Sequence, residues 1–258
     1  MPARGGRHTR CATTRRRRSR RIDGSNALQE QALDDSTPSR HRHPKPAVIL
    51  VHGLWTPAAV FALHSHWLQR RGYRPRRFGY PSVRATLAQN AQALKAFIEA
   101  TGASDIHLVG HSMGGLIILD LLAQSVDPRL RRAILLGTPC LDSHCARRLA
   151  RVAGLSTLLG RSIMEWLSRP APTRTLLASA PPVGVLAGTR SFGLGRVVPG
   201  LPHPNDGVVA VAETRLPGAA DFIALPVAHS QMLASPACAA QIVAFLETGH
   251  FRHDQEPA

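Results

Sequence analysis

The chain has 258 residues, of which 44% are hydrophobic and 19% charged, and this length and composition suit one α/β domain or two small ones. The hydrophobic share excludes disorder of the whole chain, and no apolar run reaches the roughly 18 residues that a membrane-spanning helix needs. Four cysteines without a CxxC pair predict neither a disulfide framework nor a zinc site.

The net charge of +16 would suit a nucleic-acid-binding protein, but half of it lies in the first 46 residues, where twelve basic residues stand against four acidic ones. Because this segment has almost no apolar residues, we predict a disordered N-terminal arm over residues 1–45. The arm lacks the apolar stretch of a secretion signal, and Asp34-Asp35 disfavours a transit peptide. Two interpretations stay open: a solvated tail, and an arm that contacts an anionic membrane or another polyanion.

From Pro46 onward, short apolar runs alternate with segments of helical periodicity. Strands are predicted at 47–51, 76–80, 106–109, 133–136, 183–188 and 222–228. Helices are predicted at 56–71, 82–102, 113–124 and 236–246, with hydroxyl caps at Thr56, Ser82 and Ser235. This alternation indicates a mostly parallel, doubly wound sheet with helices on both faces, in which ligands bind at the carboxyl ends of the strands.

The sequence Gly110-His111-Ser112-Met113-Gly114-Gly115 lies between a buried strand and an apolar helix. It is a G-x-S-x-G pattern, in which a serine occupies a tight strand-to-helix turn and projects its hydroxyl from the sheet. Positions two before and two after the serine crowd the neighbouring chain, so only a glycine fits there. The Met113 N–H lies at a helix N-terminus, where it can stabilise an oxyanion. The pattern therefore predicts Ser112 as a nucleophile.

The end of the first strand, Val51-His52-Gly53-Leu54-Trp55, is suited to supply a second oxyanion donor. Acyl transfer uses one N–H from the residue after the nucleophile and another from the loop after an earlier strand. We expect the Leu54 N–H to be that second donor, with Gly53 allowing the backbone to approach the substrate and Trp55 adding an apolar wall. His52 and His111 complete the candidate pocket residues, and an ordinary strand-to-helix turn is the alternative interpretation.

A histidine base should follow the nucleophile, at the same edge of the sheet. His229 comes directly after the last apolar strand, whereas the other downstream histidines lie in loops or in a polar tail. Asp206 lies in a turn after the strand at 183–188 and gives the chain order Ser, Asp, His. Asp142 is the second candidate for the acid. The alternative interpretation of Asp206 is a turn former before glycine.

These motifs resemble the α/β-hydrolase superfamily, and within it the bacterial lipase/esterase-like branch. The matching segments are His52-Gly53-Leu54, Gly110–Gly115, Gly137-Thr138-Pro139, Asp206-Gly207-Val208-Val209 and His229. The resemblance implies an α/β-hydrolase fold over residues 46–250 and a Ser112, Asp206 and His229 triad. It also implies an oxyanion hole from Leu54 and Met113, and neither a cofactor nor a metal. The arm occupies the place of the first antiparallel strands, so we expect a short sheet of about six strands.

Residues 141–182 are predicted to form a small helical insertion over the site. Apolar positions there alternate with arginines, namely Leu149, Val152, Leu155, Leu158, Leu159, Ile163, Trp166 and Leu167 with Arg147, Arg148, Arg151, Arg161 and Arg169. This pattern is compatible with a lid that contacts lipid and with helices packed on the sheet. A long loop is expected at 193–204, and a disordered tail at 251–258.

The function expected from the sequence is hydrolysis of carboxylic esters, including lipid esters, through an acyl-enzyme. The same residues would serve a thioesterase, lactonase or amidase. A non-catalytic lipid-binding protein is a further alternative, and a nucleic-acid-binding module rests on the arm alone. We expect a cytoplasmic protein, peripheral to a membrane if the arm binds one, and no specific nucleic-acid partner.

Overall fold

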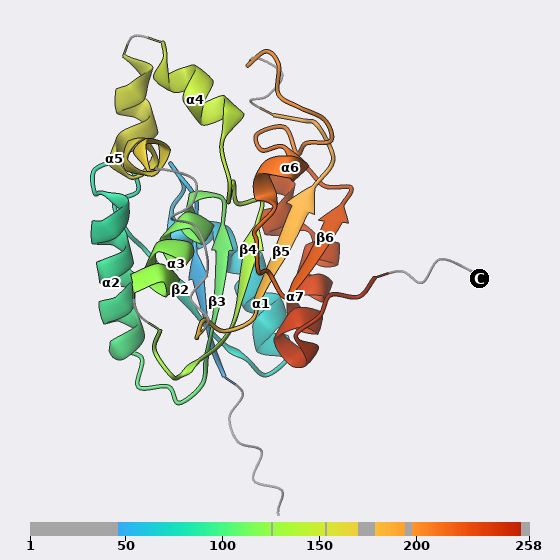
Figure 1. The fold of residues 1–258 in the computed structure, drawn as a ribbon. Helices are drawn as coiled ribbons and strands as arrows, with labels where there is room; N and C mark the ends of the chain where they lie inside the picture. The colour runs from blue at the N-terminus through green and yellow to red at the C-terminus, as the bar shows by residue number, and fades with distance from the viewer. Residues whose placement is uncertain (1–45, 125, 153, 170–178, 194–197, 254–258) are drawn as a thin grey trace, which may run out of the picture. The chain divides into compact units, whose positions relative to one another are not determined.

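The central sheet of the computed structural model has six strands in the order β2-β1-β3-β4-β5-β6, and every neighbouring pair is parallel (Figure 1). The strands are β1 (Ala47–Val51), β2 (Arg74–Phe78), β3 (Ile106–His111), β4 (Leu130–Leu136), β5 (Val183–Gly188) and β6 (Asp221–Leu225). The short parallel sheet of the α/β-hydrolase fold is thus confirmed. The structure describes residues 46–124, 126–152, 154–169, 179–193 and 198–253, so the predicted arm and most of the predicted tail lie outside it.

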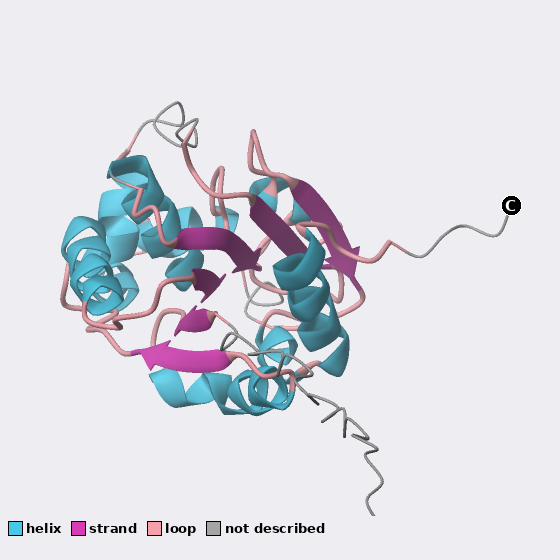
Figure 2. Cartoon of the chain, turned by 90° about the horizontal axis from the view of Figure 1, so that it is seen from below, coloured by secondary structure: helices cyan, strands magenta, loops and turns pink. Residues whose placement is uncertain are grey.

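Helices cover both faces of the sheet, as Figure 2 shows. They are η1 (Ala58–Phe61), α1 (Ala62–Arg70), α2 (Leu87–Glu99), α3 (Met113–Gln124), α4 (His144–Ala150), α5 (Leu155–Ser168), α6 (Val211–Thr214), η4 (Ser230–Ala234) and α7 (Pro236–Thr248). Helices α2 and α3 pack together on one face, and α1 and α7 lie on the other. No helix in the described segments is long and apolar enough to cross a membrane.

Alternate residues of each central strand enter different cores. In β1, Ile49 belongs to the core beneath α2 and α3, whereas Leu50 belongs to the core beneath α1 and α7. Because both faces of β1, β3 and β5 are buried, these strands read as continuous apolar runs. Phe251 packs on Phe245 with ring centroids 4.9 Å apart, so the packed chain continues past residue 250.

Several predicted element boundaries were wrong. Strand β4 begins at Leu130 rather than at 133, and β6 spans Asp221–Leu225 rather than 222–228. Strand β2 begins at Arg74, two residues before the predicted start, because this edge strand buries only Phe78 and carries no apolar pattern. Helix α2 is capped by Thr86, whose side chain and that of Gln89 form a reciprocal capping box, whereas Ser82 accepts a hydrogen bond from the Trp55 amide. The segment after Thr56 opens as the 3-10 turn η1 before α1 begins.

Candidate active site

Ser112 stands between β3 and α3 in a left-handed backbone conformation, with φ of 54°. Such a conformation is costly for a residue with a side chain and persists only where its surroundings enforce it. The enforcing contacts are with the neighbouring backbone: a Cβ on Gly110 would lie 2.6 Å from the Gly115 amide nitrogen, and one on Gly114 would lie 2.1 Å from the Val51 oxygen. The two glycines therefore let β3, α3 and β1 approach closely enough to hold Ser112 in this turn.

Asp206 and His229 form a buried hydrogen-bonded pair. The His229 Nδ1 lies 2.7 Å from Asp206 Oδ2, and the His229 amide donates to the Asp206 carbonyl at 2.9 Å. Asp206 is fully buried, and its Oδ1 accepts hydrogen bonds from the amides of Val208 (2.9 Å) and Val209 (2.7 Å). With Oδ1 held by these donors, Oδ2 accepts a hydrogen bond from the Nδ1–H of His229, and this tautomer leaves Nε2 of the imidazole unprotonated.

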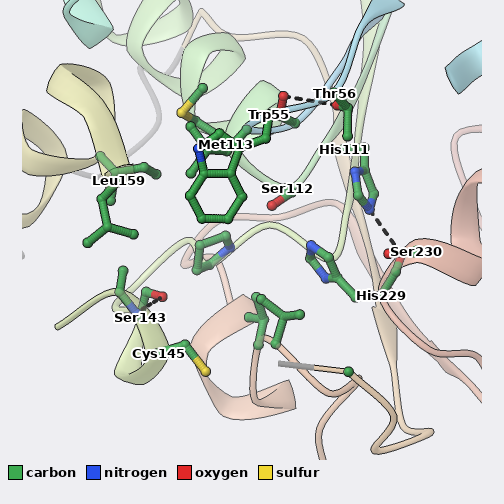
Figure 3. Close-up of a pocket in the computed structure, with 18 of the residues that line it drawn as sticks. Trp55, Thr56, His111, Ser112, Met113, Ser143, Cys145, Leu159, His229 and Ser230 are labelled. Atoms are coloured by element: carbon green, nitrogen blue, oxygen red, sulfur yellow. Dashed lines mark hydrogen bonds between the residues drawn. The ribbon is translucent and has the colours of Figure 1, made fainter. Parts of the chain in front are cut away.

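Ser112 and His229 line one cavity, and Figure 3 shows both side chains at its wall. No hydrogen bond joins the serine hydroxyl to the imidazole in the part of the chain that the structure describes. Such contacts are often formed only when substrate is bound. Asp142, the second candidate for the acid, instead pairs with Arg147 at 2.6 Å, where both side chains are partly exposed.

The backbone amides of Leu54 and Met113, both residues of the cavity lining, have no acceptor among the described residues. The Gly53 carbonyl accepts hydrogen bonds from His52 Nδ1 at 2.8 Å and from the Thr56 hydroxyl at 3.1 Å. Because N–H and C=O point in opposite directions across a trans peptide, these bonds turn the Leu54 N–H away from His52. The two free amides are thus available to an oxyanion.

The predicted pocket residues fall into two groups. Gly53, Trp55 and His111 line the cavity, but His52 lies behind it, where its ring stacks on Tyr80 with centroids 4.2 Å apart. The Tyr80 hydroxyl also donates to the His52 carbonyl at 2.5 Å. The prediction of His52 as a pocket wall was therefore wrong, because its ring supports the Gly53 turn from behind.

His111 is buried next to Ser112 and contacts His229 twice. Its Nε2 donates to the His229 carbonyl at 3.0 Å, and the two rings have centroids 4.7 Å apart. Complete burial, followed by the nearby charge of His229, holds the pKa of His111 well below its usual value, so the ring is neutral at pH 7. His111 thus fixes the backbone that carries His229.

Sequence reasoning assigned no role to two glycines that make room for the acid–histidine pair. A Cβ on Gly137 would lie 3.0 Å from Asp206 Oδ2 and 3.1 Å from His229 Nδ1, and a Cβ on Gly188 would lie 2.8 Å from the Asp206 Cβ. Gly137 directly follows β4, and Gly188 is the last residue of β5. This position at the carboxyl end of a strand is the signal that could have identified them.

The cavity has a volume of about 400 Å³, and no Asp, Glu, Lys or Arg is among the described residues that line it. Helices α4 and α5 form its roof with Cys145, Ala146, Leu149, Leu159 and Ile163. Burial raises the pKa of Cys145 to about 11, so this thiol stays protonated and is no competing nucleophile at neutral pH.

The roof is anchored to the body of the protein through polar side chains. The buried Ser162 hydroxyl accepts from Asn90 Nδ2 at 2.9 Å and donates to the Ala85 carbonyl at 2.9 Å. Glu165 Oε2 accepts from the Leu87 amide at 2.6 Å, at the N-terminus of α2. The predicted insertion thus packs against α2, and its inner face covers the cavity.

Comparisons with known proteins agree with this geometry. Residues 48–258 match the model of the alpha/beta hydrolase family. The chain is similar to the lipase BlEst2 from Bacillus licheniformis: the propeptide form has a TM-score of 0.63 and 19% identity over 84% of this chain and 52% of that one. The mature form has a TM-score of 0.58 and 18% identity over 80% of this chain and 92% of that one.

A thermophilic esterase from Thermogutta terrifontis is similar with a TM-score of 0.56 and 20% identity, over 79% of this chain and 90% of that one. The comparison with curated proteins found no match. At these identities the solved structures establish the fold, and the chain spans about half the length of the propeptide form of BlEst2. The family match covers nearly all of the residues that build the sheet and the cavity, and the chain belongs to the alpha/beta hydrolase family.

Proposed function

We propose that the protein is a serine hydrolase that cleaves carboxylic esters through an acyl-enzyme. The observation that carries this proposal is the shared cavity: a strained serine and an imidazole already bonded to a buried carboxylate face the same apolar space. This arrangement supplies a nucleophile, a base and an orienting acid. Structures of similar fold include a lipase and an esterase, which supports the choice of ester substrates.

In the acylation half, Ser112 Oγ attacks the ester carbonyl carbon as its proton passes to His229 Nε2. The carbonyl electron pair moves onto oxygen, and the Leu54 and Met113 amides stabilise this oxyanion, at roughly 3–4 kcal/mol for each donor in comparable sites. Collapse of the tetrahedral intermediate breaks the bond to the alcohol, which leaves with the proton from His229. The acyl group remains esterified to Ser112.

In the deacylation half, His229 removes a proton from water, and the resulting nucleophile attacks the acyl carbon. A second collapse breaks the bond to Ser112 Oγ, returns the proton to it and releases the carboxylic acid. Asp206 keeps the imidazole oriented throughout, because its Oδ1 accepts from two backbone amides while Oδ2 accepts from the imidazole Nδ1–H.

The cavity favours uncharged, apolar acyl groups. An anionic acyl tail would lose its hydration against a lining without a basic side chain, which is costly, whereas apolar chains gain by burial. Thioesters, lactones and amides would use the same residues, so they belong in the same substrate panel.

The test is a chain-length series of p-nitrophenyl esters, with matching thioesters, lactones and amides. We expect ester hydrolysis that falls by about 10⁴-fold or more in Ser112→Ala, the scale typical of lost nucleophiles. Ser104→Ala removes a hydroxyl far from the cavity and should leave the rate unchanged. Equal rates in both variants would contradict the proposal.

A further inference from the structure

Exposed large apolar side chains gather at the cavity and on the roof that covers it. Of six such side chains in the described segments, Trp55 (56% exposed) and Phe192 (63%) line the cavity. Val152 (52%), Leu158 (55%) and Met164 belong to the roof or to the turn between its helices, and one, Leu63, lies elsewhere on α1. A concentration of this kind on one end of a protein marks an interaction surface.

The roof also carries uncompensated positive charge. The nearby acids are already engaged: Asp142, just before α4, pairs with Arg147, and Glu165 of α5 pairs with Arg169. The other three arginines of the roof, Arg148, Arg151 and Arg161, are exposed and have no acidic partner among the described residues. The roof thus combines exposed apolar side chains with three arginines that have no acidic partner in the described part of the chain.

Trp55 is held in place at this mouth. Its indole Nε1 donates to the Leu158 carbonyl at 2.8 Å, and its amide donates to the Ser82 hydroxyl at 3.3 Å. Its φ of 59° is unusual for a bulky residue and is maintained by these contacts. The indole therefore ties the loop after β1 to α5 and presents its apolar ring outward in a fixed position.

The roof beneath these side chains is fixed as well. Helix α5 is interrupted at Gly160, where a Cβ would lie 2.6 Å from the Val83 oxygen, and the Arg161 amide donates to that oxygen at 2.9 Å. Ser162 and Glu165 bind the start of α2 and hold the roof in place. The exposed side chains of Trp55, Val152, Leu158 and Phe192, here called the rim, need no hinge motion of the roof to reach solvent. The surface is preformed.

We infer that this rim docks on anionic lipid surfaces, with the arginines contacting headgroups and Trp55, Val152, Leu158 and Phe192 entering the headgroup–acyl boundary. Arginine and exposed apolar side chains together match an anionic lipid layer, whereas a nucleic acid would match the charge alone. This inference rests on the proposed ester hydrolysis. It means that the cavity mouth faces the membrane and that esters enter the cavity from the membrane without opening of the roof.

The test is quenching of Trp55 fluorescence by vesicles of brominated phosphatidylglycerol and phosphatidylcholine, with the full chain. The difference between wild type and Trp55→Phe isolates the Trp55 signal from the other two tryptophans. We expect that signal to be quenched several-fold by the anionic vesicles and unchanged by vesicles of brominated phosphatidylcholine alone. Since no turnover is involved, Ser112→Ala should behave like wild type, so this test can fail or succeed independently of the catalytic proposal.

A matched pair of triple variants separates the rim from the basic arm. Arg148→Gln/Arg151→Gln/Arg161→Gln should raise the Kd for anionic vesicles roughly 10- to 100-fold, as expected for three lost headgroup contacts. Arg74→Gln/Arg76→Gln/Arg77→Gln removes three exposed charges from β2 and should change the Kd no more than about threefold. Vesicle binding without quenching of Trp55, or with equal effects of the two triple variants, would overturn the inference and assign binding to the arm.

Discussion

Different forces hold the floor of the cavity, which is the Ser112 turn between β3 and α3, and its roof, which is formed by α4 and α5. At the floor, Ser112 is fixed by backbone approaching backbone, so closely that a methyl group on Gly114 would lie 2.1 Å from a carbonyl oxygen. At the roof, α5 is fixed by side-chain hydrogen bonds such as those of Ser162 and Glu165. Steric exclusion is absolute at this range, whereas each hydrogen bond contributes only about 0.5–1.5 kcal/mol. The candidate nucleophile therefore lies in a part of the fold that tolerates few substitutions. The cavity-lining residues of the roof lie in a part that tolerates more.

The largest expected effect concerns Asp206, the carboxylate that is hydrogen-bonded to His229. Asp206→Asn should lower kcat by about 10³–10⁴-fold, because an amide can hold the histidine in the wrong tautomer while its oxygen keeps the Val208 and Val209 amides bound. Asp142→Asn, at the base of the roof, should change kcat less than about twofold, since its partner is Arg147. Steady-state kinetics with a short ester decide, and equal losses in both variants would contradict the assignment of Asp206.

The steric character of the floor is tested by Gly114→Ala. We expect the free energy of unfolding to fall by about 3 kcal/mol or more, because the new Cβ would meet the backbone of β1 and cannot relax. Gly79→Ala is the control, since its Cβ would find its nearest neighbour at 3.9 Å. Urea denaturation measures both, and a Gly114→Ala protein as stable as the control would show that the turn is not enforced by this contact.

Acid should lower the free energy of unfolding through two histidines of β3, the strand that precedes Ser112. His107 and His111 lie near the two ends of β3; burial lowers the pKa of His107 to about 4 and that of His111 well below its usual value. Since the unfolded chain binds protons near pH 6.5, stability present above that pH is lost as the pH falls toward the folded pKa. Between pH 6.5 and 5, His107 alone should contribute a loss of about 2 kcal/mol.

This pH dependence is measured by urea denaturation at several pH values. In His107→Gln, the loss in the free energy of unfolding between pH 6.5 and 5 should be smaller than in wild type by about 2 kcal/mol. An unchanged slope would show that His107 does not titrate on unfolding.

The smallest effect is expected at the roof. Ser162→Ala leaves the buried Asn90 amide and the Ala85 carbonyl without their partner and should lower the free energy of unfolding by about 1–2 kcal/mol. Because the floor is untouched, kcat for a short ester should stay within about twofold. Ser168→Ala removes a hydroxyl from the same helix, at an exposed position, and should cost less than about 0.5 kcal/mol. A large loss of kcat in Ser162→Ala would mean that floor and roof are coupled.

The floor could be predicted from the sequence because its constraints are local. Gly110 and Gly114 lie within two residues of Ser112, and the apolar runs of β1 and β3 identify buried parallel strands. Asp206 and His229 were candidates because each follows a strand, although their hydrogen bond joins residues 23 positions apart. Residues far apart in sequence meet here because parallel strands bring their carboxyl ends to one edge.

The roof could be predicted only as a helical insertion. Its position depends on contacts such as Gly160 with Val83 and Ser162 with Asn90, and no periodicity in the sequence signals these pairs. The start of β2 was missed for a related reason: an exposed edge strand rich in arginine gives no alternating pattern. Tertiary contacts that are mediated by single polar side chains leave no pattern to read.

The central claim is that Ser112 is made reactive by His229, and the most direct measurement is the rate of labelling by a fluorophosphonate probe, with the modified peptide identified by mass spectrometry. We predict one adduct, on Ser112, formed at a rate that falls by about 10³-fold or more in His229→Gln. An adduct on another residue, or equal labelling rates in wild type and His229→Gln, would contradict the account.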